Sequence, residues 1–221
     1  GRLISENDSL FYELSSTSKN HDILYAINDD EISKLYKKPI YVDTTMRLKA
    51  ALFDDNLIQL GTTFEQNINL HKAVGAKITL DKEPHPSYNA GGNTALINGI
   101  SGHNKRYGDK EWLGFLGEDI KVLIEFDIPT KINSIATRFY NGNGQWIYAP
   151  KTIEVSFDKG QYKQVANIKA TDSIIATFDL KLQHMIVNTM TLKIPNYGII
   201  REGKQGAGNK AWTFIDEIII E

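Results

Sequence analysis

Cysteine is absent from this 221-residue chain, which excludes a disulfide framework and any thiolate metal site. The absence does not identify a compartment, because a secreted bacterial domain needs no disulfides. The chain has a formal net charge of −2 and an isoelectric point near 6.3. It therefore lacks the excess of basic residues typical of nucleic-acid-binding proteins, and no nucleic-acid partner is expected. No apolar run is long enough to cross a bilayer and no signal peptide is evident, so we expect no membrane span.

What the chain does contain is short runs of β-branched and aromatic residues that alternate with polar ones at a period of two. No amphipathic helical pattern interrupts them, so the pattern predicts an all-β fold. Loops dense in Gly, Asn and Trp separate the runs between residues 88 and 157. We predict a small sandwich over residues 1–72, followed by an eight-stranded, double-sheet jelly roll over residues 73–221. Such a fold presents its end loops for recognition.

The predicted strands follow the alternating runs. In the first domain they are 10–14, 23–27, 39–42, 46–53 and 57–64; in the second they are 76–80, 121–127, 132–140, 150–157, 161–166, 173–180, 189–195 and 211–220. Residues 81–120 hold no clear strand, and so long an irregular stretch is typically functional or stabilised by an ion.

Catalytic machinery is not expected in this chain. Asp216 and Glu217 form an adjacent acidic pair, but they lie in an apolar strand whose pleating sends them to opposite faces. The histidines show neither metal-ligand spacing nor a nucleophile partner. The loop Gly203–Gly208 lacks the trailing Gly-Lys-Ser/Thr and the helix of a phosphate loop.

Four motifs in the second domain carry a resemblance to a known family. They are Ala95-Leu-Ile-Asn-Gly99, Glu111-Trp-Leu-Gly-Phe115, Gln145-Trp-Ile-Tyr-Ala-Pro150 and Ala211-Trp-Thr-Phe-Ile-Asp-Glu-Ile218. They resemble the C-terminal discoidin-type (coagulation-factor C-type) module of bacterial family-20 β-N-acetylhexosaminidases, also called chitobiases. Runs 23–31, 35–40 and 44–51 are similar to the immunoglobulin-like domain that precedes this module in the family.

The resemblance implies an immunoglobulin- or fibronectin-like sandwich followed by a discoidin-like (galactose-binding-like) jelly roll. Both are accessory to a catalytic barrel, which would lie upstream of Gly1 and be a partner of this region. A chain that starts at Gly1 rather than Met also indicates a piece cut from a longer protein. A periplasmic, cell-surface or secreted location in a bacterium is implied by the enzyme class alone.

A structural calcium ion is also implied by the resemblance. The matching positions are Asn98 and Glu217, with Ser101 and Asp109 nearby in sequence, and calcium prefers six to eight oxygen ligands. Asn98 stands where the family has Asp, which removes one negative charge and weakens binding. The alternative is that Asn98-Gly99 is an ordinary turn and Glu217 a buried, hydrogen-bonded carboxylate.

The loop 140–146 corresponds to a ligand-binding loop of related carbohydrate-binding modules, which implies a glycan containing N-acetylhexosamine or galactose. Aromatic rings stack on the apolar faces of sugars, and polar side chains bind the hydroxyl groups. The candidates for stacking are Trp112, Tyr140, Trp146, Tyr148 and Tyr197, and those for hydrogen bonding are Arg138, Asn141 and Asn143.

Two other functions remain open. Tryptophans at strand ends are more often core lids or plugs at a domain interface, and the chain would then be a structural spacer packed on the catalytic barrel. A flat apolar loop tip would instead favour a protein-adhesion module.

Overall fold

The computed structural model describes residues 1–6, 9–169 and 171–221. The chain is all-β, as the sequence predicts, and divides into two compact units, Gly1–Leu70 and His71–Glu221. The boundary predicted between residues 72 and 73 lies two residues beyond this division. Within the described ranges, no helix is long and apolar enough to span a membrane.

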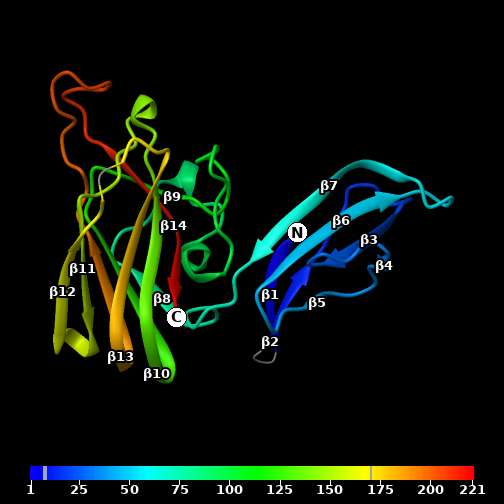
Figure 1. Cartoon of the computed structure of the whole chain (residues 1–221). Coiled ribbons are helices and arrows are strands. Elements are labelled where there is room, and N and C mark those ends of the chain that lie inside the picture. Colours follow the sequence, from blue (N-terminus) through cyan, green and yellow to red (C-terminus); the bar gives the residue numbers. More distant parts are fainter. Residues whose placement is uncertain (7–8, 170) are drawn as a thin grey trace. The chain divides into compact units, whose positions relative to one another are not determined.

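The first unit is a sandwich of two antiparallel sheets, ordered β1-β2-β5 and β4-β3-β6-β7 (Figure 1). Its strands are β1 (Arg2–Glu6), β2 (Ser9–Glu13), β3 (Asp22–Ile27), β4 (Lys34–Leu35), β5 (Ile40–Tyr41), β6 (Met46–Phe53) and β7 (Gln59–Ile68). Strand β3 alternates buried and less buried side chains, as expected of a strand with one face on a core. Tyr12, Leu48 and Ile68 are among the core residues. The sequence did not predict β1 or β4.

The second unit contains seven strands in its described part. They are β8 (Lys77–Leu80), β9 (Leu113–Leu116), β10 (Ile120–Tyr140), β11 (Thr152–Phe157), β12 (Tyr162–Asn167), β13 (Ile175–Ile194) and β14 (Trp212–Ile220). Residues 120–125 of β10 pair with β8 and with the end of β13, whereas residues 135–140 pair with β14 and with the start of β13. The long antiparallel pair β10–β13 therefore belongs to two layers, β12-β11-β13-β10-β8 and β13-β10-β14-β9.

Two pairs of predicted strands are single strands in the structure. Runs 121–127 and 132–140 are both β10, and runs 173–180 and 189–195 are both β13. The register between β10 and β13 shifts between Glu125 and Thr130 and again between Ile132 and Ser134. Such irregularities bend a ladder without ending it, so an interrupted sequence pattern predicts two strands where the structure has one.

Strand β9 lies within residues 81–120, where the sequence shows no clear strand. Its first three residues, Leu113, Gly114 and Phe115, are all buried, so no alternation of burial marks it. The rest of this stretch includes two short 3-10 helices, η1 (Pro86–Tyr88) and η2 (Asn93–Ile97). Only pairing with β14 identifies β9 as a strand.

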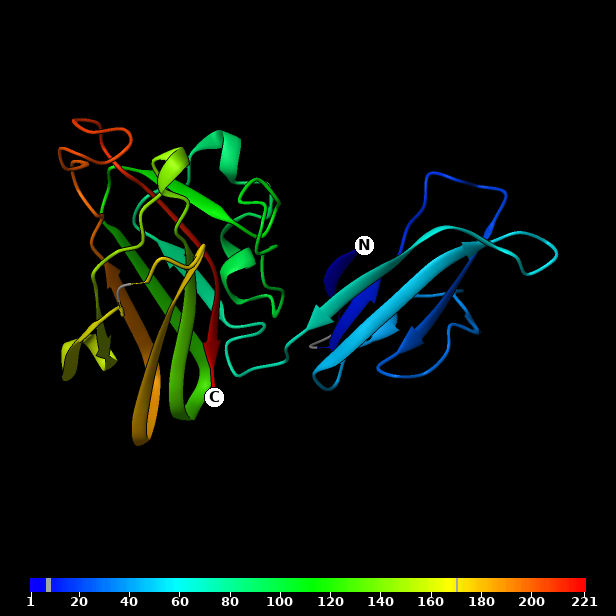
Figure 2. The same ribbon diagram turned by 45° about the horizontal axis from the view of Figure 1, so that its top comes forward.

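Two long connecting loops of the second unit lie together at one end of its sheets. The loop that holds η3 (Asn143–Gln145) and the loop of residues 196–211 lie at the same end in both ribbon views (Figures 1 and 2). Backbone hydrogen bonds tie this end together, among them Trp212 N–H to Trp146 O at 2.9 Å. The strands thus hold loops that are distant in sequence close together.

Candidate functional site: a cavity at the loop end

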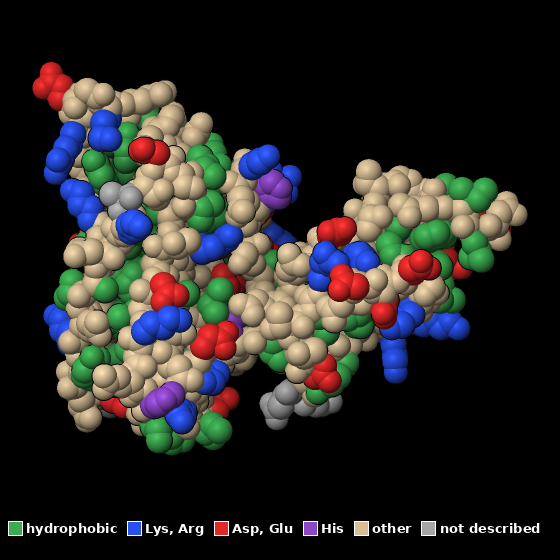
Figure 3. Space-filling view, viewed as in Figure 1, with side chains coloured by type: hydrophobic (Ala, Val, Ile, Leu, Met, Phe, Trp, Pro, Cys, Tyr) green, Lys and Arg blue, Asp and Glu red, His purple; other side chains and the backbone are tan. Residues whose placement is uncertain are grey.

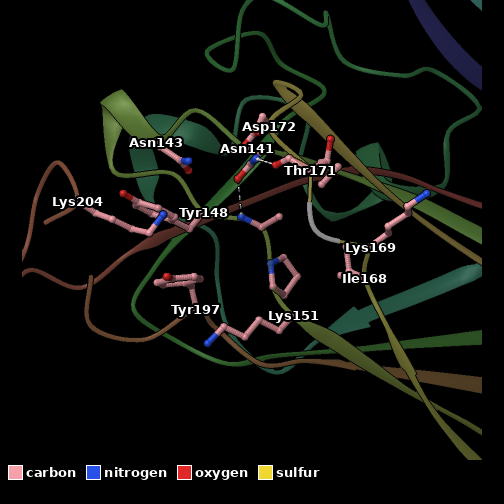
Figure 4. A pocket seen from close by; sticks show the side chains of 13 residues that line it. Asn141, Asn143, Tyr148, Lys151, Ile168, Lys169, Thr171, Asp172, Tyr197 and Lys204 are labelled. Atoms are coloured by element: carbon pink, nitrogen blue, oxygen red, sulfur yellow. Dashed lines mark hydrogen bonds between the residues drawn. The ribbon is translucent and has the colours of Figure 1, made fainter. Parts of the chain in front are cut away.

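A solvent-open cavity of about 390 Å³ lies among these loops. Its walls come from three segments, residues 141–151, residues 168–176, and the loop that carries Tyr197 and Lys204. Figure 4 shows these side chains around it. Trp146 does not line the cavity but packs on Gly206, two residues along the chain from the lining residue Lys204. The cavity and Trp146 together are called the loop site below.

Asn141 connects two walls of the cavity. Its Nδ2 donates to the carbonyl oxygens of Thr171 and Ser173 at 3.1 and 3.2 Å, and its Oδ1 accepts from Ala149 N–H at 3.4 Å. Because these bonds occupy both amide hydrogens, Asn141 holds the loops in place and has no hydrogen left to donate to a ligand.

Tyr148 and Tyr197 form a stacked pair with ring centres 4.7 Å apart. Lys204 Nζ lies 6.0 Å from the centre of the Tyr148 ring, and Lys151 Nζ lies 4.9 Å from that of Tyr197. Figure 4 shows the four side chains in the order Lys204, Tyr148, Tyr197, Lys151. Burial raises the pKa of Tyr148, whose hydroxyl donates to the carbonyl oxygen of Gln205 at 3.2 Å. Both rings are therefore parts of the cavity wall, with lysines on their outer sides.

Trp146 is the exposed aromatic residue of the loop end, with 39% of its surface accessible. Its backbone is left-handed (φ 63°), and its N–H donates to Asn143 O at 3.1 Å as η3 ends. A Cβ added to Gly206 would lie 2.4 Å from Trp146 Cδ1. The indole therefore packs directly on the backbone of Gly206, at a point where only glycine leaves room.

Several polar side chains of the cavity have no partner within the protein. Among the described residues, Asn143, Lys169 and Asp172 make no side-chain hydrogen bond or ion pair. Exposed, unpaired groups beside an aromatic surface are available to a polar ligand.

Trp112 and Tyr140 are buried and Arg138 is partly buried with internal partners, so none of the three lies on the ligand-binding surface that the sequence predicts. Trp112 is fully buried, Tyr140 is 5% exposed, and their rings meet edge to face at 5.5 Å. They belong to an aromatic cluster that includes Phe214. Burial in this cluster, together with the bond from Trp112 Nε1 to His103 O at 3.2 Å, leaves no ring face for a sugar.

Arg138 is committed to internal partners. Its Nε donates to Asp216 Oδ2 at 3.0 Å, and its two terminal nitrogens donate to Asn104 Oδ1 at 2.9 Å and to Gly102 O at 2.7 Å. Burial raises the pKa of Asp216, and the guanidinium of Arg138 opposes that rise. Arg138 therefore compensates a buried charge.

The adjacent Glu217 has a separate set of partners. Its Oε1 accepts from His71 Nε2 at 2.6 Å and from Gly99 N–H at 2.9 Å, while its Oε2 is buried and has no hydrogen-bond partner among the described residues. Burial raises the pKa of Glu217, and the bond from His71 opposes the rise. The two acidic side chains thus serve different contacts, which agrees with the opposite faces predicted from pleating.

The four residues predicted to bind calcium fit a cation unequally. Glu217 Oε2 is a free buried oxygen, which suits a cation. Asn98 Oδ1 accepts from Ile100 N–H at 2.8 Å, and both oxygens of Asp109 accept from backbone N–H groups. Ser101 is exposed. Across the described residues, no group of three or more His, Asp or Glu side chains is placed to hold a metal, so Glu217 is the side chain of the four that offers a free buried oxygen.

Of the residues proposed for glycan binding, Asn141, Asn143, Tyr148 and Tyr197 line one cavity. The sequence did not identify Lys151, Lys169, Thr171, Asp172 and Lys204. In the sequence, a loop lysine that lines a cavity cannot be distinguished from an ordinary solvent-exposed lysine. The one usable signal is that Lys204 lies in the glycine-rich loop 203–208.

The sequence matches no protein-family model. It also matches no curated protein. Among solved structures, it is similar to chitosan-binding module 1 derived from the chitosanase/glucanase of Paenibacillus sp. IK-5 (12% identity, TM-score 0.40, covering 69% of this chain and 99% of that one). It is also similar to the lectin domain of lectinolysin complexed with Lewis B antigen (9% identity, TM-score 0.45, covering 69% and 96%). A third is CpGH89CBM32-5 from Clostridium perfringens in complex with GalNAc-β-1,3-galactose (14% identity, TM-score 0.41, covering 67% and 96%). Similarity at this level assigns no function to this chain.

Proposed function

We propose that the unit His71–Glu221 is a carbohydrate-binding module and that the loop site binds the sugar. The observation that carries the proposal is the exposed indole of Trp146, held against Gly206 in the loop whose Lys204 lines an open cavity with unpaired polar side chains. An exposed indole suits the apolar face of a sugar ring, and the free groups of Asn143 and Asp172 suit its hydroxyls.

The loops that form the site are already fixed without a ligand. Asn141 joins residues 141 and 149 to the segment 171–173, and the Tyr148 hydroxyl joins the 145–150 motif to Gln205. A preformed site loses less conformational entropy when it binds. This favours recognition by rigid loops over folding on binding.

The parent protein that we propose is a family-20 β-N-acetylhexosaminidase, on the motifs of both domains and their order along the chain. In it this region would be a non-catalytic accessory part, outside the cytoplasm of a bacterium. A weak sugar site linked to a catalytic domain raises the effective concentration of substrate near that domain.

A structural calcium ion remains part of the proposal. Glu217 Oε2 would be its carboxylate ligand, and most other ligands would be backbone carbonyls. Thermal melting with calcium and with a chelator tests this, and an unchanged melting temperature would contradict it.

The test of sugar binding compares two aromatic residues of similar exposure. Trp146 is 39% exposed in the loop site, and Tyr162 is 44% exposed on β12. We expect the chain to bind on an array of neutral and acidic glycans, Trp146→Ala to weaken binding about fivefold or more, and Tyr162→Ala to bind as the wild type does. Absence of binding to every glycan would overturn the proposal and favour a structural spacer.

A further inference from the structure

Three lysines line the loop site, and their charges are not balanced. Lys151, Lys169 and Lys204 line the cavity together with a single carboxylate, that of Asp172, so three positive charges and one negative charge give its lining a formal charge of +2. The whole chain carries −2. The formal charge of the cavity lining is thus opposite in sign to the net charge of the whole chain.

These lysines differ from two lysines of the neighbouring sheet strands β12 and β13. Lys163 and Lys193 both pair with Glu154, at 2.6 and 3.1 Å. By contrast, the three cavity lysines have no ion-pair partner in the described part of the chain. In Figure 3, Lys and Arg side chains gather at the upper left of the larger unit, near the loops of the site, with fewer Asp and Glu side chains among them.

Two of the ammonium groups are positioned by aromatic rings. The stack of Lys204, Tyr148, Tyr197 and Lys151 holds each lysine near a ring face, a contact that restrains the amine without using its N–H donors. The same stack occupies the ring faces of both tyrosines. A ligand in the cavity therefore meets amines and ring edges, so charge and hydrogen bonds outweigh stacking there.

A neutral glycan would leave this positive charge without a counterpart. A saccharide with a carboxylate or sulfate group supplies one, while its ring still offers an apolar face to Trp146 and hydroxyls to Asn143. We propose that the loop site selects acidic saccharides, with Lys151, Lys169 and Lys204 binding the acidic group. This inference rests on the proposed function and narrows it to a ligand class.

The experiment uses matched pairs of probes that differ in charge. Trigalacturonate is compared with its methyl ester, and N-acetylgalactosamine 6-sulfate with N-acetylgalactosamine, by titration calorimetry of the whole chain. We expect at least one acidic probe to bind about tenfold or more tightly than its neutral counterpart, and added salt to weaken that preference. The two arms distinguish a carboxylate from a sulfate ligand.

Matched variants test the lysines. Each of Lys151→Gln, Lys169→Gln and Lys204→Gln should weaken acidic binding by about two- to fivefold, the range of exposed ion pairs, and the triple variant by about tenfold or more. The control is a triple variant with the same change in net charge at exposed lysines outside the cavity. It combines Lys82→Gln, Lys105→Gln and Lys131→Gln and should retain the preference.

Three results would overturn the inference. The first is equal binding of charged and neutral probes, or binding of neutral glycans alone, which would leave the sugar site standing. The second is an equal loss in the two triple variants, or equally tight binding of an oligoglutamate of matched charge, either of which would indicate general attraction of anions. The third is no binding of any probe or array glycan, which would also remove the proposed function.

Discussion

Aromatic residues at the same end of the second unit differ in their exposure to solvent. Trp112, Tyr140 and Phe214 form the buried aromatic cluster, whereas Trp146 is exposed and packs on Gly206. Trp112 and Trp146 have the same side chain and both occur in motifs that resemble one family. What separates them is the neighbouring structure: strands and the 102–109 loop enclose one ring, and a glycine backbone supports the other.

Charged side chains of this unit likewise differ, since some are paired inside the protein and others are left unpaired at the cavity. Arg138 uses its guanidinium on Asp216, Gly102 and Asn104 beneath the surface. Lys204 instead keeps its ammonium group beside an open cavity. Arg138 offsets the cost of burying the Asp216 carboxylate, whereas an unpaired charge at the cavity is available for binding.

Replacing each tryptophan is the strongest test of this contrast. Trp112→Ala should lower the free energy of unfolding by about 3–5 kcal/mol, because it leaves a cavity in a fully packed site. Trp146→Ala should cost about 1 kcal/mol or less, since its side chain is partly in water. Denaturant unfolding measures both. Similar losses in the two variants would break the distinction between core and site.

Arg138→Met tests whether this arginine is structural. It keeps the apolar stem but leaves the buried carboxylate of Asp216 without its cation, so we expect a loss of about 3 kcal/mol in unfolding free energy. Arg201→Met, at an exposed loop arginine, serves as the control and should change stability by about 0.5 kcal/mol or less. A stable Arg138→Met protein that had lost sugar binding would return Arg138 to the binding site.

Comparing substitutions at two glycines of one loop distinguishes the effect of backbone strain from the loss of packing against Trp146. Gly206 and Gly208 both have φ near +84°, but only a Cβ on Gly206 would meet the indole. Each Ala variant should cost about 1 kcal/mol for its left-handed backbone. Gly206→Ala should also displace Trp146 and weaken sugar binding about fivefold or more. Equal binding by Gly206→Ala and Gly208→Ala would show that the position of Trp146 is unimportant.

The pH dependence of stability gives the smallest effect. Burial raises the pKa of Glu111 above its ordinary value of 4.5, although Asn98 and Lys110 oppose the rise. Above pH 4.5 the folded state then binds more protons than the unfolded state, so the contribution of Glu111 becomes less favourable as pH increases. Between about pH 5 and pH 7, Glu111→Gln should therefore gain stability relative to the wild type.

Glu154→Gln is the control for that measurement. Its bonds with Lys163 and Lys193 lower the pKa of Glu154, so its contribution is already complete above pH 4.5. The difference between this variant and the wild type should stay constant from about pH 5 to pH 7. If the stability difference of Glu111→Gln from the wild type were also constant over this range, burial would not raise the pKa of Glu111 as proposed.

Much of the architecture was predictable because it depends on local periodicity. Alternation along residues 46–53 and 152–157 identifies strands, since one face of each must meet a core. That β10 and β13 are each one continuous strand was not predictable, because each strand continues through irregularities where its pairing with the other shifts register. Of the residues that the sequence proposes for sugar binding, Asn143, Tyr148 and Tyr197 line the cavity, whereas Trp112 and Tyr140 lie in the core.

The sequence alone determined that this chain is all-β and that loops rich in Asn, Gly and Trp connect strands of its second unit. Tertiary structure decided which tryptophan is covered, which arginine is neutralised and which lysines are left unpaired around one cavity. The physical reason is that alternation is a property of neighbouring residues, whereas burial and charge pairing depend on side chains brought together from distant segments.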